Sequence, residues 1–246
     1  MGKIIIVCLF LFFIIMRGGA IEAHSFKVGE KLSYKVKFLG FVVGEQTLEV
    51  KNGVEINGYP TYLFLSATKT VGLVSLLYRL DSRTECFADL KTLYPRRLII
   101  HRYENSDSNE TRVEVNLNEK LAIARIKDIN YTWSRNFSLP ILDAVSLTYW
   151  LRTQDLEVGK EFSASFIEGQ KIRELKVKVV KEEEVWTYTG SYFTFLCSEA
   201  SSKERKMWFT TDKRHLPVKL QAETSIGILT AYLSEIEQDS LSSGSP

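Results

Sequence analysis

The stretch SLPILDAVSLTYWLR, residues 138–152, has the strongest helical pattern in the chain. Pro140 suits a first helical turn, because that turn has unpaired N–H groups and proline lacks one. Ser138 is placed to cap those donors, and Asp143 favours the positive end of the helix dipole. We therefore predict a helix over residues 139–152.

This helix is apolar on nearly all sides. One face of the helical wheel carries Ile141, Leu142, Val145 and Tyr149, and the opposite side carries Leu147, Trp150 and Leu151. A helix of this kind needs packing surfaces in more than one direction. We predict that it lies inside or across a curled sheet.

The rest of the chain is dominated by strand patterns. Residues 31–38, KLSYKVKF, alternate strictly between polar and apolar side chains, which is typical of a strand with one buried face. Comparable segments recur before and after the predicted helix, separated by turn signals such as Asn52-Gly53. The predicted fold class is mainly β, a strongly curled antiparallel sheet or open β-barrel with one central helix.

Three segments are less regular. Residues 71–77, VGLVSLL, show no clear alternation, so a short helix and a strand fit them equally. The run of charged residues 181–184, KEEE, is predicted to be a solvated turn between two strands. The polar residues 104–110 have the composition of a hairpin loop.

The N-terminus predicts export. Residues 4–16 are almost all apolar, which is short for a membrane span and suits the core of a secretory signal. Small residues follow, and we expect cleavage after Ala23, with Ala20 as the alternative site; an uncleaved N-terminal anchor is the other interpretation. We therefore predict a signal peptide over residues 1–23, a periplasmic protein, and no transmembrane segment after cleavage.

The remaining length fits one domain. We predict a single β-rich domain over residues 24–238 and a disordered Ser/Gly-rich tail over residues 239–246. FKVGEKL at residues 26–32 is similar to LEVGKEF at 156–162, which predicts two half-repeats, 26–137 and 156–236. The alternative is that both segments are ordinary turn punctuation at strand ends.

Charge argues against a polyanionic partner. The formal net charge is +2 for the whole chain, and it falls to +1 without residues 1–23, since Lys3, Arg17 and Glu22 leave with them. A nearly neutral chain offers no extended field for nucleic acid and no polybasic membrane patch.

The sequence contains no recognisable catalytic or metal-binding motif. His24, His101 and His215 lack partners at metal-ligand spacing, and the acidic residues of the strands are typical of a solvated face. We expect no catalytic residue, no metal site and no cofactor, hence no enzyme; a hydrolase acting on envelope polymers would need convergent carboxylates in a cleft. Cys86 and Cys197 form a disulfide in one interpretation and are free buried thiols in the other.

The aromatic residues allow two interpretations. The chain has 14 Phe, 11 Tyr and 4 Trp, and many fall on the inward phase of strands. They either pack a solid core or line a cavity for an acyl chain or another apolar ligand. In the second case the candidate ligand-binding residues are Tyr149 and Trp150 on the helix, with apolar lips at the mouth formed by Val71, Leu73, Leu76, Ile226 and Ile228.

Several of these segments together resemble a known family. Their order and spacing are similar to the bacterial envelope family called domain of unknown function 3108, over nearly all of residues 26–236. The matching segments are VGEKLSY at 28–34, Gly44, LDAVSLTYWLR at 142–152, VG at 158–159, GSYF at 190–193 and WFTTD at 208–212, leading to Pro217. One departure is Leu142-Asp143, where the family opens the helix with aspartate and proline.

The resemblance implies an exported β-rich protein without an agreed activity, and it transfers no catalytic residue. Curled-sheet relatives of the lipoprotein-carrier class add an analogy of fold to lipid handling. The function predicted from these observations is non-catalytic binding of an apolar or lipid-like ligand in the cell envelope. The alternative is an envelope assembly or scaffold protein that docks a partner protein through an exposed strand edge or the apolar lips. Both alternatives leave the oligomeric state open.

Overall fold

The computed structural model describes residues 24–127, 131–169, 171–200, 205–224 and 227–238. Within them, two helices and fifteen strands form. The first half contains β1 (Glu30–Phe38), β2 (Phe41–Asn52), β3 (Thr61–Thr70), α1 (Val74–Leu77), β4 (Leu80–Asp89), β5 (Pro95–Glu104), β6 (Asp107–Asn116), β7 (Leu121–Ile126) and β8 (Tyr131–Asn136). The second contains β9 (Ile141–Leu142), α2 (Ala144–Arg152), β10 (Glu161–Glu168), β11 (Lys171–Thr187), β12 (Gly190–Glu199), β13 (Lys206–Thr210), β14 (Pro217–Thr224) and β15 (Gly227–Gln238).

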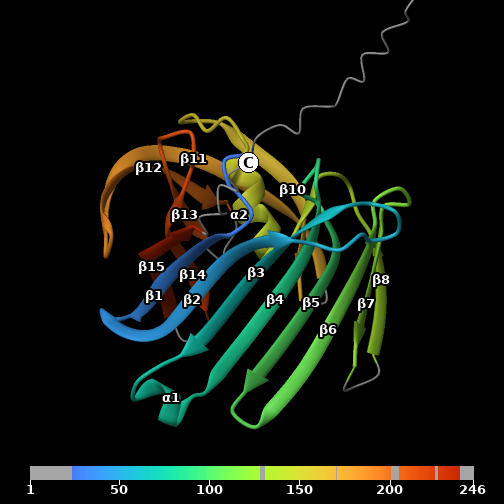
Figure 1. Ribbon diagram of the computed structural model, residues 1–246, viewed down its shortest axis with the longest axis horizontal. Helices are drawn as coiled ribbons and strands as arrows, with labels where there is room; N and C mark the ends of the chain where they lie inside the picture. Colours follow the sequence, from blue (N-terminus) through green and yellow to red (C-terminus); the bar gives the residue numbers. More distant parts are fainter. Residues whose placement is uncertain (1–23, 128–130, 170, 201–204, 225–226, 239–246) are drawn as a thin grey trace, which may run out of the picture.

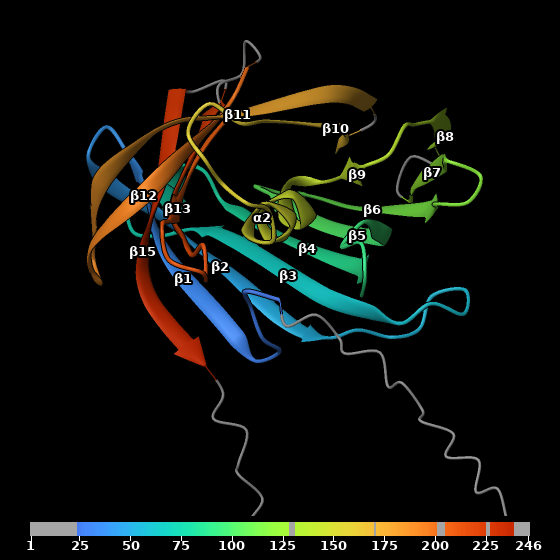
Figure 2. The same ribbon diagram turned by 90° about the horizontal axis from the view of Figure 1, so that it is seen from above.

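All fifteen strands belong to one sheet. Its order is β8-β7-β6-β5-β4-β3-β2-β1-β15-β14-β13-β12-β11-β10-β9, so the first strand lies beside the last and the two halves of the chain extend from that pair. Every pairing is antiparallel except that of β9 with β10. The sheet curls around α2 without closing, as Figures 1 and 2 show. The predicted fold class, a strongly curled antiparallel sheet with a central helix, is confirmed.

The second half of the sheet bends back on itself. The long hairpin of β11 and β12 returns to β15, where the Tyr188 N–H donates to the Leu233 carbonyl at 3.0 Å. Figure 2 shows β12 curving toward β15 on this side of the molecule. Residues 181–184, predicted as a turn, instead continue β11 as a strand, since they pair with residues 193–196 of β12 beyond a bulge after Val179.

The central helix exists, but its predicted start is wrong. It begins at Ala144, and Asp143 caps it by accepting hydrogen bonds from the backbone N–H groups of Val145 and Ser146, both at 3.0 Å. The Ser146 hydroxyl accepts in return from the Asp143 N–H at 2.9 Å, which completes a capping box. Residues 138–142 do not join the helix, because β9 pairs with β10 and the Ser138 N–H donates a hydrogen bond to the Ser165 hydroxyl.

Helix α2 lies between two apolar clusters, as its two apolar faces predict. Val145 and Tyr149 pack into a cluster formed mainly by the first half of the chain, which includes Phe26 and Phe64. The opposite face packs into a second cluster through Leu147 and Leu151, together with Phe166 of β10 and Phe209 of β13. Leu142, predicted on the face of Val145 and Tyr149, lies in β9 instead and belongs to this second cluster. The strands nearest to the helix are β3, β4, β9 and β10, which come from both halves of the sheet.

The two cysteines lie in different clusters. Cys86 belongs to the first and Cys197 to the second, and both are free and buried, so no disulfide joins them. Burial and the neighbouring Asp143 carboxylate raise the pKa of the Cys86 thiol, and burial raises the pKa of Cys197 to about 12. Both groups are therefore protonated at neutral pH and behave as core residues.

The other irregular segments take short forms. Residues 71–77 contain the single helical turn α1, which Figure 1 shows between β3 and β4. The hairpin predicted at residues 104–110 is present, but its loop is shorter than predicted, because β5 and β6 pair as far as Glu104 and Asp107 and leave a two-residue turn. The predicted signal peptide, residues 1–23, the predicted tail, residues 239–246, and Ile226 lie outside the described residues. Among the described helices, none is both long and apolar enough to cross a membrane.

Candidate functional site

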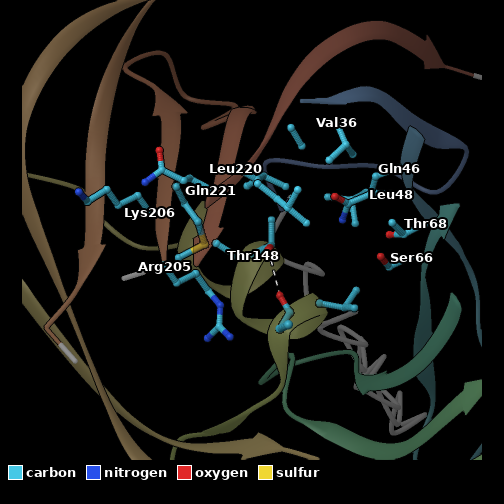
Figure 3. Close-up of a pocket in the computed structure, with 16 residues that line it drawn as sticks. Val36, Gln46, Leu48, Ser66, Thr68, Thr148, Arg205, Lys206, Leu220 and Gln221 are labelled. Carbon is cyan, nitrogen blue, oxygen red and sulfur yellow. Dashed lines mark hydrogen bonds between the residues drawn. The ribbon is translucent and has the colours of Figure 1, made fainter. Parts of the chain in front are cut away.

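A cavity of about 230 Å³ lies between the first turns of α2 and the inner face of the sheet. The helix contributes Ala144, Val145 and Thr148 to its wall. The sheet contributes residues from both sides of the β1–β15 pair, as Figure 3 shows. These are Val36, Gln46, Leu48, Ser66, Thr68, Lys206, Met207, Leu220, Gln221, Ala222, Leu229 and Ala231, together with Arg205 before β13.

The sheet register brings these residues to one level. Leu48 pairs with Ser66 and Gln46 with Thr68, so β2 and β3 present one continuous patch. On the other side, Ala222 pairs with Leu229. Residues two apart on a strand face the same way. Gln46 and Leu48 on β2, and Ser66 and Thr68 on β3, therefore all face the helix.

The space is left by small side chains. Four wall positions are Ala or Ser, namely Ser66, Ala144, Ala222 and Ala231, where the helix and the sheet face each other. A side chain too short to reach its neighbour leaves its contacts unmade, and the volume stays open to a ligand. The wall is mainly apolar, and its inward-facing uncharged polar groups come from Gln46, Ser66, Thr68 and Thr148.

The arginine at this cavity is already paired. Arg205 lies 3.2 Å from the Glu199 carboxylate and 3.4 Å from that of Glu168, and its guanidinium stacks over the Phe166 ring at 4.7 Å. Its charge is thereby held at the side of the cavity. An apolar wall with a few uncharged amides and hydroxyls favours an apolar ligand that carries a small polar group.

The predicted ligand-binding residues lie elsewhere. Tyr149 is fully buried, with its ring stacked on Phe64 at 4.0 Å, and burial raises its pKa well above the ordinary value. Trp150 is half-buried and meets Phe162 edge-on at 5.8 Å. Neither lines the cavity, and among the described residues that do, none is aromatic. The aromatic side chains near the helix therefore pack the core.

The predicted lips lie at one end of the sheet. Val71, Leu73 and Leu76 belong to the connection between β3 and β4, and Leu73 and Leu76 are largely exposed. Ile228 is exposed near the start of β15. The cavity lies toward this same end, because Thr68 and Leu229 in its wall are close in sequence to these turns.

Sequence reasoning missed most of the wall. Val36 and Leu48 lie on the inward phase of alternating strands, so their direction was readable. The alternation of polar and apolar residues does not predict where inward-facing side chains of the sheet are too short to contact the helix. The short inward residues Ser66, Ala222 and Ala231 were the available signal.

Two larger clefts are open and more polar. One lies where the sheet fails to close, along residues 136–139 and β10. The other lies at the C-terminal end of α2 and includes His24 and His215, which contact the carbonyls of Leu90 and Arg152. Throughout the described part of the chain, no three His, Cys, Asp or Glu side chains group in a way that could hold a metal ion.

The structure also joins two segments of the family-like pattern. Glu30 from the first and Arg152 at the end of the helical one form a buried ion pair, with 2.5 Å between Arg152 Nη1 and Glu30 Oε1. Arg152 also donates to the carbonyls of Ser25 and Arg214. These contacts fasten the N-terminal segment and the β13–β14 turn to the end of α2.

Three solved structures of low sequence identity are similar to this chain. A DUF1849 β-barrel-like protein from Brucella abortus aligns over 86% of this chain and 98% of its own, with a TM-score of 0.55 and 9% identity. A DUF1089 protein from Pseudomonas aeruginosa aligns over 72% and 88%, with a TM-score of 0.40 and 14% identity. A candidate exported protein with a YmcC-like fold from Bacteroides fragilis aligns over 86% and 97%, with a TM-score of 0.31 and 11% identity.

The first of these similarities supports the fold alone. Among curated proteins, none matches the sequence significantly. The model of the family described as "Protein of unknown function (DUF3108)" matches residues 33–234, which is most of the chain. The chain therefore belongs to the DUF3108 family.

Proposed function

We propose that this protein binds an apolar or lipid-like ligand without transforming it, as an exported, periplasmic protein of the cell envelope. The observation that carries the proposal is the cavity beside α2, whose wall is mainly apolar and includes several small side chains. An apolar wall of this kind favours binding of an apolar ligand, because binding removes apolar surface of both from water.

The volume sets the class of ligand. A dry apolar cavity of about 150 Å³ is large enough to bind benzene, and drug-sized ligands occupy about 300 to 1,000 Å³. The 230 Å³ found here therefore suits a short acyl segment or a small aromatic molecule, with a polar group near the Gln46 amide. A whole phospholipid would leave most of its length outside.

Export is supported by the N-terminal sequence. Residues 4–16 have the length and composition of a secretory signal core. Intact-mass measurement on protein recovered from a periplasmic extract tests this part. A mass that lacks residues 1–23 is expected, and a full-length mass in the membrane fraction contradicts it.

Ligand binding is tested with a fluorescent probe. N-phenyl-1-naphthylamine should become brighter on binding the protein, and decanoate should displace it. Ala222→Phe places a ring in the cavity and should weaken probe binding at least about tenfold. Thermal unfolding confirms that the variant folds, and Ser66→Leu provides a second way to fill the cavity.

The matched control is Ala67→Phe. Ala67 lies on β3 between Ser66 and Thr68, so its side chain faces the other side of the sheet. This variant should bind the probe as the wild type does. Equal binding by wild type and Ala222→Phe, or equal loss in Ala222→Phe and Ala67→Phe, contradicts ligand binding in the cavity.

A second candidate function is docking of a partner protein at β8. This strand forms one edge of the sheet, where its one neighbour in the strand order is β7. Five of its six side chains are exposed. An open strand edge can accept an extended segment of another protein. A photo-crosslinker at Thr132 should then give one dominant crosslinked protein in cells, and its absence argues against this function.

A further inference from the structure

The polar groups of the cavity wall lie together on one side of it. Gln46 of β2 pairs directly with Thr68 of β3, and Ser66 precedes Thr68 by two residues, so the three side chains share the inner face of the sheet. Figure 3 shows them on one side of the cavity and Arg205 on the other. Thr148 of α2 faces the same cavity from the helix. We call Gln46, Ser66, Thr68 and Thr148 the polar subsite.

The polar subsite offers both donors and acceptors to a ligand. The side chains of Gln46, Ser66 and Thr68 form no hydrogen bond with any other described residue. The Thr148 hydroxyl donates to the Ala144 carbonyl at 3.0 Å, which leaves its oxygen as an acceptor. A ligand that displaces water from these groups must supply hydrogen bonds in place of those it removes. A purely apolar ligand would therefore leave this side of the cavity unsatisfied.

The arginine on the other side belongs to a cluster whose described charges cancel. Arg205 lies 3.2 Å from the Glu199 carboxylate and 3.4 Å from that of Glu168. Arg173 lies 2.6 Å from Glu199 and 2.9 Å from Glu168. Two arginines and two carboxylates, +2 and −2, give a sum of zero. The charge of Arg205 is therefore compensated before a ligand enters.

The other charged groups around the polar subsite face outward. Lys206 neighbours Met207 and pairs with Gln221, so it lies on the outer face of β13, and Figure 3 shows it directed away from the subsite. Glu45 and Lys69 flank the subsite on β2 and β3, where they face outward and pair with each other at 3.4 Å. None of these groups is placed to pair with a charge inside the cavity.

One buried anion lies next to the wall. Asp143 directly precedes Ala144, and its carboxylate accepts hydrogen bonds from the N–H groups of Val145 and Ser146, both at 3.0 Å. Its oxygens are thus engaged by the helix cap, and its negative charge opposes a second carboxylate nearby. Among the described residues at the cavity, an ionised ligand group would find no unpaired charge of opposite sign.

We propose that the ligand of this cavity is an alkyl or acyl chain that ends in an uncharged hydrogen-bonding group, such as an amide or an alcohol, held by the polar subsite. The inference rests on the proposed function for the apolar chain, and it adds the charge and bonding class of the polar end. An ionised carboxylate or ammonium would lose its hydration without gaining a partner. An amide or hydroxyl instead replaces the hydrogen bonds that water made.

Displacement of N-phenyl-1-naphthylamine by ligands of equal chain length tests the polar end. Decanamide and decanoate are titrated at pH 7, below the concentrations at which they form micelles, and their half-displacing concentrations are compared as a ratio. Decanoate should require at least about tenfold more than decanamide, and so should decylamine, which is cationic at this pH. The ligands differ in water in the same way for every variant, so a change in the ratio reports the wall.

Two substitutions at Gln46 test the position of the subsite. Gln46→Lys places an ammonium group close to the site of the amide, so decanoate gains a partner and its ratio to decanamide should fall at least about tenfold. Gln46→Met keeps a similar length without hydrogen-bonding groups, and it should weaken decanamide about two- to tenfold with little change in probe affinity. Thermal unfolding and probe binding establish that both variants fold.

The matched control is Thr47→Lys. Thr47 lies on β2 between Gln46 and Leu48, so its side chain faces the outer side of the sheet. This variant adds the same charge to the same strand without placing it in the cavity. The ratio of decanoate to decanamide should stay at its wild-type value.

The outcomes separate this inference from the proposed function. If neither the probe nor decanamide binds the wild type, the proposed function fails and the inference fails with it. If the probe binds, three results overturn the inference alone: decanoate or decylamine displaces the probe as readily as decanamide does, Gln46→Lys leaves the ratio unchanged, or Thr47→Lys lowers it equally.

Discussion

Arg152, the last residue of α2, and Glu30, the first residue of β1, form an ion pair that is buried from solvent. Arg152 Nη1 lies 2.5 Å from Glu30 Oε1, and Nη2 lies 3.0 Å from Oε2. The two residues are 122 positions apart, so this contact fixes the end of the helix to the pair of strands at the middle of the sheet. The position of α2, and with it the cavity wall, depends on this contact.

Removing one partner should be costly. Glu30→Gln or Arg152→Met leaves a charge or donor group buried without its partner, and each should lower the free energy of unfolding by about 3 to 5 kcal/mol. Urea denaturation of both single variants and the double variant measures the coupling. The double variant should be more stable than the sum of the single losses predicts, and simple additivity would contradict a direct pairing.

The capping box of α2 gives a smaller effect. Asp143→Ala removes the acceptor for the N–H groups of Val145 and Ser146 and should lower the free energy of unfolding by about 0.5 to 2 kcal/mol. Asp143→Asn keeps an acceptor and should lose less. Equal losses in the two variants would indicate that the carboxylate acts in another way, for example through Cys86.

The Tyr149 hydroxyl gives a prediction of opposite sign. It is buried, and no other described residue bonds to it. Tyr149→Phe keeps the ring stacked on Phe64 and removes an unpaired polar group, so the variant should be as stable as the wild type or more stable by up to about 1 kcal/mol. A clear loss of stability in denaturation would show that the hydroxyl has a partner in solution.

Asp89 should make stability depend on acid pH. Burial alone would raise the pKa of its carboxyl, but hydrogen bonds from Arg96, at 2.7 and 2.9 Å, and from the backbone of Thr92 and Lys91 outweigh burial and lower the pKa. A group with a lowered folded-state pKa contributes its full stability above the unfolded-state pKa, about 3.9 for Asp, and loses it as the pH falls through the folded-state pKa.

The test compares wild type with Asp89→Asn by thermal unfolding between pH 7 and pH 2. The variant should be less stable at pH 7, and the difference should shrink below about pH 4, where the wild-type carboxyl also becomes neutral. The other carboxylates are common to both proteins and cancel in the difference. A difference that stays constant over the whole range would exclude this ion pair as its cause.

The sequence was informative where one side-chain period persists. Residues 31–38 alternate strictly and lie within β1. The two apolar faces of residues 141–151 correctly placed the helix between two packing surfaces. The predicted half-repeats stay a prediction, although the sheet does extend in opposite directions from the β1–β15 pair.

The errors arose where tertiary contacts outweigh local pattern. Pro140 and Ser138 resemble a helix start, but pairing of β9 with β10 and the cap at Asp143 move the start to Ala144. The charged residues 181–184 resemble a turn, but a bulge lets β11 continue through them. The cavity was assigned to Tyr149 and Trp150 because aromatic residues stand out in a sequence, whereas missing volume is set by pairs of small residues on distant strands.

Locating a bound ligand tests the central claim most directly. Crystals of the protein grown with 10-bromodecanoate would show the bromine by its anomalous signal. The account predicts a peak between α2 and the inner face of the sheet, close to Val145, Leu48 and Leu220. A bromine found only on the outer surface, or a well-ordered cavity that stays empty at saturating ligand, would contradict it.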